Sequence, residues 1–286
     1  MVFYMQYDKI SGFSDEISPE IDIQFSTLKK LGILYFEPRG VDGDNISTLS
    51  DAQVLRLREK MDIAGIKASS IGSPVGKIKV SEDFEPHFEM FKRVVRTAKM
   101  LDCRFIRMFS FYNENETWSD EERDEVYRRL SLLIAYAEDH DVVLLHENEK
   151  DIYGDTVEKC LALMEHFACE HFGCVFDPAN FVQCGIDTKE AYVALAPYIR
   201  YVHIKDAHSE DRKVVPAGKG DGNIPYILEK LFQSGYDGFI SLEPHLGNFQ
   251  GLADLETDDL MSNLPDGGEG TFSLAYQSLC TILEAL

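Results

Sequence analysis

The chain has 286 residues, which is enough to bury a sizeable core and suits one α/β barrel domain. Hydrophobic residues make up 44% of it and charged residues 27%, as in an ordinary soluble globular protein. The formal net charge of −22 disfavours a nucleic-acid backbone or an anionic membrane as a partner, but a locally cationic pocket is compatible with it.

Targeting signals are not evident in the sequence. Met1–Asp8 does not resemble a signal peptide, and no apolar run approaches the length of a membrane helix. The six cysteines show neither a CxxC motif nor a compact framework. We therefore predict a cytoplasmic protein whose cysteines are reduced thiols.

Short apolar runs alternate with amphipathic segments along the whole chain. The runs predict strands at Ile10–Phe13, Ile33–Glu37, Ile66–Ser70, Phe105–Phe109, Val142–Glu147, Cys174–Asp177, Ile199–Ile204 and Phe239–Glu243. The amphipathic segments predict helices near Pro19–Leu31, Asp51–Ala64, Phe84–Leu101, Asp120–Asp139, Thr156–His166, Thr188–Ala196, Asn223–Gln233 and Phe272–Leu286. Eight strand–helix pairs without a linker predict one (β/α)₈ TIM barrel domain over residues 1–286. A doubly wound open sheet would instead require a glycine-rich turn after the first strand, and Gly12–Asp15 is not one.

Helix ends and loop lengths add detail to this prediction. Ser119 is typical of a helix start, and Gly32, Gly65 and Gly235 are typical of helix ends. The longest loop, Pro244–Thr271, is a candidate lid or subunit contact, so a homo-oligomer is compatible with the sequence.

Polar residues end four consecutive predicted strands. Val142–Leu145 is apolar and runs directly into His146 and Glu147. The same change of polarity brings Asp177, His203 and Glu243 to the ends of the next three strands. Parallel barrel strands deliver such side chains to one mouth, at their carboxyl ends.

Three carboxylates at one barrel mouth would repel one another, and a divalent cation would relieve that repulsion. Three oxygen donors and one imidazole suit Mn²⁺ above all, with Mg²⁺, Co²⁺ or Zn²⁺ as alternatives. Each residue taken alone could simply cap its strand at the surface. Four successive strands with ligand-type ends favour a metal site, which we predict at Glu147, Asp177, His203 and Glu243.

The chain resembles the xylose-isomerase-like TIM barrel family, in its sugar phosphate isomerase/epimerase branch. The resemblance covers nearly the whole chain and rests on six motifs in order, namely Gly12–Glu16, Phe36–Arg39, His146–Glu149, Phe176–Asn180, His203–Asp206 and Leu242–Pro244. It implies one metal held by the four predicted ligands, with Glu147 and Glu243 also transferring protons. The expected substrate is a small sugar, sugar phosphate or keto-polyol that reacts through a metal-stabilised enediolate. Epimerisation, isomerisation and dehydration of an inosose-type substrate all remain open.

Further polar residues are candidates for substrate binding. Glu37 ends the second predicted strand and Arg107 lies within the fourth, so both could bind sugar hydroxyls. Arg107 could equally pair with a buried carboxylate. Ketose epimerases often have histidine at the position of Asn180, so the asparagine argues against a specific 3-epimerase. Asn180 can still bind a hydroxyl.

A glycine-rich loop follows the seventh predicted strand. Lys205 and Lys219 flank or enter this loop, and glycines stand at 218, 220 and 222, so a phosphate site is one interpretation. The loop's equal share of acids favours a solvated loop instead. Lys77 is a similar candidate after the third strand.

Two histidines next to the predicted ligands are expected to lie outside the site. Strand alternation directs His146 away from the metal, and a surface position is preferred for His245. Two other classes of protein compete with the isomerase. An endonuclease-IV-like hydrolase would require a histidine-rich zinc cluster, and a non-catalytic sugar-binding barrel would require no metal at all.

Overall fold

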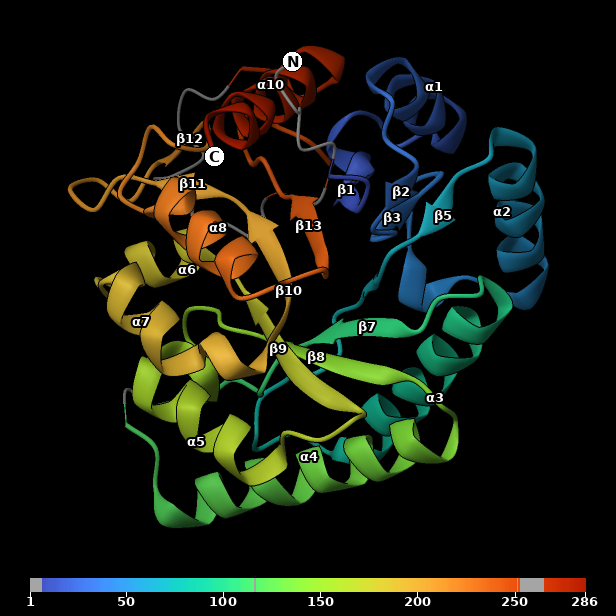
Figure 1. Cartoon of the computed structure of the whole chain (residues 1–286). Helices are drawn as coiled ribbons and strands as arrows, with labels where there is room; N and C mark the ends of the chain where they lie inside the picture. Colours follow the sequence, from blue (N-terminus) through green and yellow to red (C-terminus); the bar gives the residue numbers. More distant parts are fainter. Residues whose placement is uncertain (1–6, 116, 251, 253–264) are drawn as a thin grey trace.

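The computed structural model describes residues 7–115, 117–250, 252 and 265–286. Parallel strands lie in its centre and helices surround them on the outside (Figure 1). The central strands are β1 (Ile10–Gly12), β2 (Tyr35–Phe36), β5 (Lys67–Ala68), β6 (Ile71–Gly72), β7 (Phe105–Met108), β8 (Val143–Glu147), β9 (Phe172–Phe176), β10 (Ile199–Ile204) and β13 (Phe239–Leu242).

Hydrogen bonds close these strands into a ring. One parallel sheet runs in the order β1-β13-β10-β9-β8-β7-β6, and β2 pairs separately with β5. The amide of Glu37 donates to Gly12 O at 2.9 Å, which joins β2 to β1. The amide of Gly72 donates to Pro38 O at 2.9 Å and closes the other gap. The chain is therefore a (β/α)₈ TIM barrel, and the predicted fold is confirmed.

The outer ring consists of helices that alternate with the strands. They are α1 (Ile21–Leu31), α2 (Asp51–Ala64), α3 (Phe84–Met100), α4 (Asp120–Asp139), α5 (Val157–Phe167), α7 (Thr188–Leu195), α8 (Ile224–Gln233) and α10 (Glu269–Ala285). Ser119 caps α4 in a reciprocal bond pair with Glu122, as its position in the sequence predicts. Gly32 and Gly65 end α1 and α2 in the left-handed conformation, with φ of 76° and 72°.

Three details differ from the sequence-based prediction. The third strand is split into β5 and β6, because it pairs first with β2 and then with β7. The sixth strand begins earlier than predicted, at Phe172. Asp177 then caps a short, unpredicted helix, α6 (Pro178–Gln183), whose amide at Asn180 donates to Asp177 Oδ1 at 3.0 Å. Proline directly after an aspartate was the available signal for this helix start.

Two small antiparallel pairs decorate the barrel. One consists of β3 (Gly40–Val41) and β4 (Asp44–Asn45), and the other of β11 (Asp206–Ala207) and β12 (Val214–Val215). Among the described residues, none of the helices is long and apolar enough to cross a bilayer. Part of the predicted lid, at 251 and 253–264, lies outside the described residues, while its last residues belong to α10.

Strand alternation divides the core into two parts. Val143 and Leu145 of β8 pack with Val175 and Tyr201 in a separate apolar cluster. Leu144, between them, belongs to the large cluster that the helices cover. The first group therefore fills the barrel interior, and Glu147 is the next residue on that inner face. The apolar interior of the barrel therefore ends directly below the polar residues of its mouth.

Candidate metal centre

Four side chains from four neighbouring strands meet at the mouth of the barrel. Glu147 ends β8, Asp177 follows β9, His203 lies in β10, and Glu243 follows β13. One ligand atom from each of them lies within 4.8 Å of all the others, and all four residues are buried. The predicted ligands are thus brought together as one group.

The strands explain this convergence. Side chains two residues apart on a strand point to the same face. Glu147, Asp177 and His203 therefore point into the barrel, because each comes two residues after an interior residue, namely Leu145, Val175 and Tyr201. In the parallel pairing of these strands, Glu147 lies opposite Val175 and His203 lies opposite Ser241, each two residues before the next strand's ligand. Phe176 pairs with Val202, so Asp177 and His203 are the next residues on their two strands. Consecutive strands therefore contribute one ligand each.

His203 lies at the centre of the group. Its Nδ1 is 2.9 Å from Glu147 Oε1 and 3.2 Å from Glu243 Oε2. Burial alone would lower the pKa of His203, but the carboxylates of Glu147, Glu37 and Glu243 raise this pKa well above its usual value. In the absence of a metal, a proton on the imidazole therefore balances part of the negative charge.

The carboxylates differ in how they are held. Burial would raise the pKa of Glu243, but Lys205 and His203 hold it well below its usual value. Burial raises the pKa of Asp177 to about 7, against the opposing ammonium of Lys205. Asp177 Oδ2 is buried and accepts no hydrogen bond, although Lys205 Nζ lies 3.0 Å away. A buried carboxylate oxygen with this open coordination fits a cation.

The donor set agrees with a divalent metal. Three carboxylates and one imidazole suit Mg²⁺, Mn²⁺, Co²⁺ or Zn²⁺. Nδ1 of His203 faces Glu147 and Glu243 and would be the nitrogen that holds the ion.

Glu37 supports this histidine from the opposite side. Its Oε2 lies 3.2 Å from His203 Nε2 and accepts hydrogen bonds from Tyr201 at 3.0 Å and Ser241 at 2.8 Å. A carboxylate behind the free ring nitrogen orients a ligating histidine. The structure therefore places Glu37 below the group, and its predicted contact with a sugar hydroxyl stays a prediction.

The other predicted substrate-binding residues lie at different distances from the four predicted ligands. Arg107 is buried and donates from Nη1 to Glu147 Oε2 at 3.0 Å. Asn180 donates to Asn148 O at 2.9 Å and, more weakly, to Glu147 Oε1 at 3.4 Å. Lys205 lies between Asp177 and Glu243. Lys219, by contrast, is exposed in its loop.

The prediction for His146 is confirmed, and the prediction for His245 is not. His146 points away from the ligands and contacts Ser110 Oγ at 3.0 Å, as strand alternation predicts. The expectation of a surface position for His245 is wrong, because its residue is only 3% exposed. A φ of 45° turns the chain back over the mouth, and the amide of His245 donates to Glu16 Oε2 at 2.8 Å. His245 Nε2 then lies 3.5 Å from Glu243 Oε1.

A buried arginine was missed in the analysis of single residues. Arg39 binds both oxygens of Asp15, at 2.8 and 3.1 Å, and its Nη1 lies 3.4 Å from Glu243 Oε1. Burial raises the pKa of the adjacent Glu16 to about 7. The signal was present in the motifs Gly12–Glu16 and Phe36–Arg39, both of which follow strands at the same end of the barrel.

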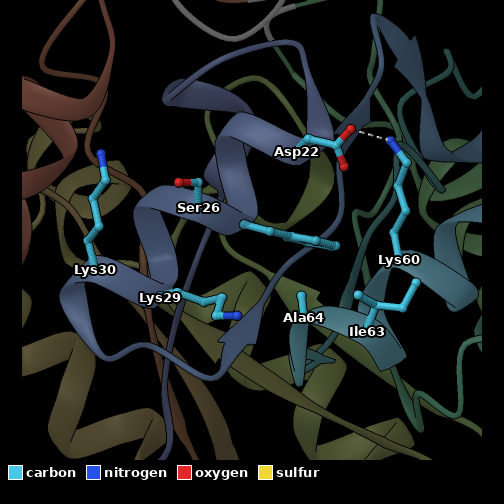
Figure 2. Close-up of a pocket in the computed structure, with 8 residues that line it drawn as sticks. Asp22, Ser26, Lys29, Lys30, Lys60, Ile63 and Ala64 are labelled. Atoms are coloured by element: carbon cyan, nitrogen blue, oxygen red, sulfur yellow. Dashed lines mark hydrogen bonds and ion pairs between the residues drawn. The ribbon is translucent and has the colours of Figure 1, made fainter.

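A hollow on the outer surface contains none of these residues. It lies between α1 and α2 and is lined in part by Lys29, Lys30 and Lys60 (Figure 2). Lys60 pairs with Asp22 at 2.9 Å, which Figure 2 shows as a dashed line. The hollow is separate from the barrel mouth.

The chain belongs to the xylose isomerase-like TIM barrel family, whose model matches residues 25–261. It is 24% identical to a 3-dehydroshikimate dehydratase of Bacillus anthracis over 134 residues, which is 47% of this chain and 48% of that protein.

Solved structures share the fold at low identity. An L-ribulose 3-epimerase superimposes with a TM-score of 0.74 at 19% identity, covering 96% of this chain and 94% of the other. The IOLI protein, solved with a bound zinc atom, gives a TM-score of 0.74 at 18% identity, covering 97% and 98%.

Proposed function

We propose that this chain is a metal-dependent isomerase or epimerase of a small sugar, sugar phosphate or keto-polyol. The observation that carries the proposal is the convergence of Glu147, Asp177, His203 and Glu243 within 4.8 Å, in a buried site at a barrel mouth. Sugar epimerases among the structural neighbours support it.

The four converging residues would hold one divalent ion, for which we propose Mn²⁺, with Mg²⁺, Co²⁺ or Zn²⁺ as alternatives. Such an ion supplies a Lewis acid that polarises a substrate carbonyl. Glu37 would orient His203 for its part in the ligand set.

Glu147 and Glu243 are the proposed acid and base. Each has one oxygen next to His203 and the other held by a cationic group, Arg107 for Glu147 and Arg39 for Glu243. Carboxylates fixed in this way can take a proton from the carbon next to a carbonyl and return one without first reorienting. Return to the opposite face of the same carbon gives epimerisation, and return to the neighbouring carbon gives isomerisation.

Arg107, Asn180 and Lys205 are the proposed contacts to substrate oxygens, since each reaches the ligand group from a different strand or helix. Lys219 would need a substrate that extends as far as its exposed loop. A homo-oligomer formed through the Pro244–Thr271 loop remains part of the proposal.

Dehydration is the second candidate function, because the sequence relative in Bacillus anthracis is a 3-dehydroshikimate dehydratase. The same first proton transfer, followed by loss of a β-hydroxyl, would produce it. The two functions share the metal group and differ in the substrate.

The test begins with the metal content of the purified protein, followed by incubation of the loaded enzyme with ketoses in D₂O. We expect one divalent ion per chain and deuterium at the carbon next to the carbonyl. Loss of one water from 3-dehydroshikimate, without exchange in any ketose, would favour the dehydratase. A protein that binds no metal after reconstitution would contradict both.

A further inference from the structure

A second pair of charged residues lies beside the ligand group. Lys77 belongs to the turn after β6, and Glu149 stands two residues after Glu147. Lys77 Nζ is 3.6 Å from Glu149 Oε2, and the two side chains are 14% and 11% exposed. This separation is too long for a hydrogen bond, so both groups keep capacity for one.

Phe109 connects this pair to the ligand group. Lys77 Nζ lies 4.4 Å and Arg107 Cζ 4.6 Å from the centre of its ring. Arg107 in turn binds Glu147. Burial lowers the pKa of Lys77, and the charges of Glu149, Arg107, Glu147 and Glu243 also act on it. The ammonium thus lies within electrostatic range of the ligands.

The turn that carries Lys77 is fixed in place. Gly76 has a φ of 89°, and a Cβ there would lie 2.0 Å from Phe109 O, so the turn packs directly on the end of β7. Phe109 donates to Val75 O at 2.8 Å, and the amide of Gly76 donates to His87 Nε2 at 2.8 Å. Lys77 is therefore positioned before any ligand arrives.

The glycine-rich loop cannot serve as a phosphate cradle, because Asp206 fills it. Asp206 Oδ2 accepts from the amides of Gly218 and Gly220 at 2.8 and 3.0 Å. Its Oδ1 accepts from the amide of Gly222 at 2.8 Å. The backbone donors that would hold a phosphate are already bound to a carboxylate of the chain itself.

The cations around the mouth are likewise paired. Lys77 faces Glu149, Arg107 faces Glu147, and Lys205 faces Asp177 and Glu243. A phosphate dianion would have to separate one of these pairs and face the remaining carboxylate. A hydroxyl has no such cost, because it can accept from an ammonium and donate to a carboxylate at once.

We propose that Lys77 and Glu149 bind the hydroxyl-bearing end of an uncharged substrate, and that the enzyme acts on free rather than phosphorylated ketoses. This inference rests on the proposed isomerase or epimerase function. Lys77 donates to one hydroxyl and Glu149 accepts from the same or the next one. The pair thus distinguishes free from phosphorylated sugars, because Glu149 repels a terminal phosphate.

The test uses matched pairs of substrates with the Mn²⁺-loaded enzyme, such as D-fructose with D-fructose 6-phosphate and L-ribulose with L-ribulose 5-phosphate. We expect kcat/KM for deuterium exchange to favour the free sugar at least tenfold. In Glu149→Gln the unpaired Lys77 should accept phosphate, and the preference should fall at least tenfold. Lys77→Met should raise KM for the free sugar more than it lowers kcat.

Glu114→Gln is the matched control, since it removes the same charge from the exposed pair of Glu114 with Lys79. It should leave the substrate preference unchanged. A wild-type preference for the phosphorylated sugars, or equal effects of the two glutamine variants, would overturn the inference.

Binding separates this inference from the proposed function. Calorimetric titration with D-glucitol and D-glucitol 6-phosphate requires no turnover. Wild type should bind only D-glucitol, Lys77→Met should bind neither, and Glu149→Gln should bind the phosphate ester. If these results hold while no ketose exchanges deuterium, the proposed reaction fails and the binding site stands. If wild type binds D-glucitol 6-phosphate more tightly, the inference fails whatever the reaction.

Discussion

Asp177 and Asp206 follow neighbouring barrel strands at the same end of the molecule, and both are fully buried. Asp206 is saturated: the amides of Ala207, Gly218, Gly220 and Gly222 donate to its two oxygens at 2.8 to 3.0 Å. Asp177 accepts one amide bond at Oδ1 and none at Oδ2, which faces only the ammonium of Lys205 at 3.0 Å. A strand-end carboxylate with complete bonding shapes a loop, whereas one with an open oxygen is available for a cation.

The largest expected effect on metal binding and activity comes from replacing Asp177. Asp177→Ala should remove the metal and lower exchange activity by roughly 10³-fold or more, because a Lewis acid contributes several kcal/mol. Elemental mass spectrometry and deuterium exchange measure the two losses. Asp206→Asn is the control and should retain the metal. Equal metal content in both variants would remove the distinction between the two aspartates.

The next effect concerns proton transfer within the same group. Glu243→Gln keeps an oxygen donor but cannot take a proton, so exchange should slow by about 10²- to 10⁴-fold. The bound metal should fall much less than the rate. A variant that exchanges at the wild-type rate would show that Glu243 is only a ligand.

The saturated carboxylate should matter for stability. Asp206→Asn replaces one acceptor oxygen by a donor that faces amides, which should cost about 3 kcal/mol of unfolding free energy. Denaturant titration of the metal-free protein measures this cost. The same titration of Asp177→Ala should show a smaller loss, because burial opposes the charge of Asp177 and its Oδ2 accepts no hydrogen bond, which offsets the lost ion pair with Lys205. The reverse order would contradict the comparison.

A smaller effect is expected one step away from the ligands. Glu37→Gln weakens the support of His203 Nε2, so metal affinity should drop about 10- to 100-fold while the fold is retained. Competition with a metal indicator measures the change. If the metal affinity equals that of wild type, Glu37 does not support His203, and its contacts with Tyr201 and Ser241 serve only packing.

The smallest effect is the pH dependence of metal binding. Burial raises the pKa of Asp177 to about 7, and neighbouring carboxylates raise that of His203, so the metal-free group binds protons that a metal must displace. Affinity should therefore fall as pH drops below about 7, by up to tenfold per pH unit for each proton. Titrations at several pH values test the sign. Tighter binding at lower pH would contradict it.

The sequence was sufficient for the fold because the barrel depends on local patterns. Apolar runs, capping residues such as Ser119 and helix-ending glycines such as Gly32 act over a few residues, and each carries its own signal. The four converging residues were also predictable, since each directly follows an apolar strand core. The strand break between β5 and β6 was not predictable, because it depends on which neighbour the strand pairs with.

The partners of several polar side chains were decided by the tertiary structure alone. No local pattern shows that His245 turns back to Glu16, that Glu37 lies behind His203, or that Asp206 fills the glycine-rich loop. Each contact joins residues at least 12 positions apart, and the first two join residues 229 and 166 positions apart. Sequence periodicity reports which face a residue takes, but pairing between distant segments arises only when the barrel closes and burial forces each charge to find a partner.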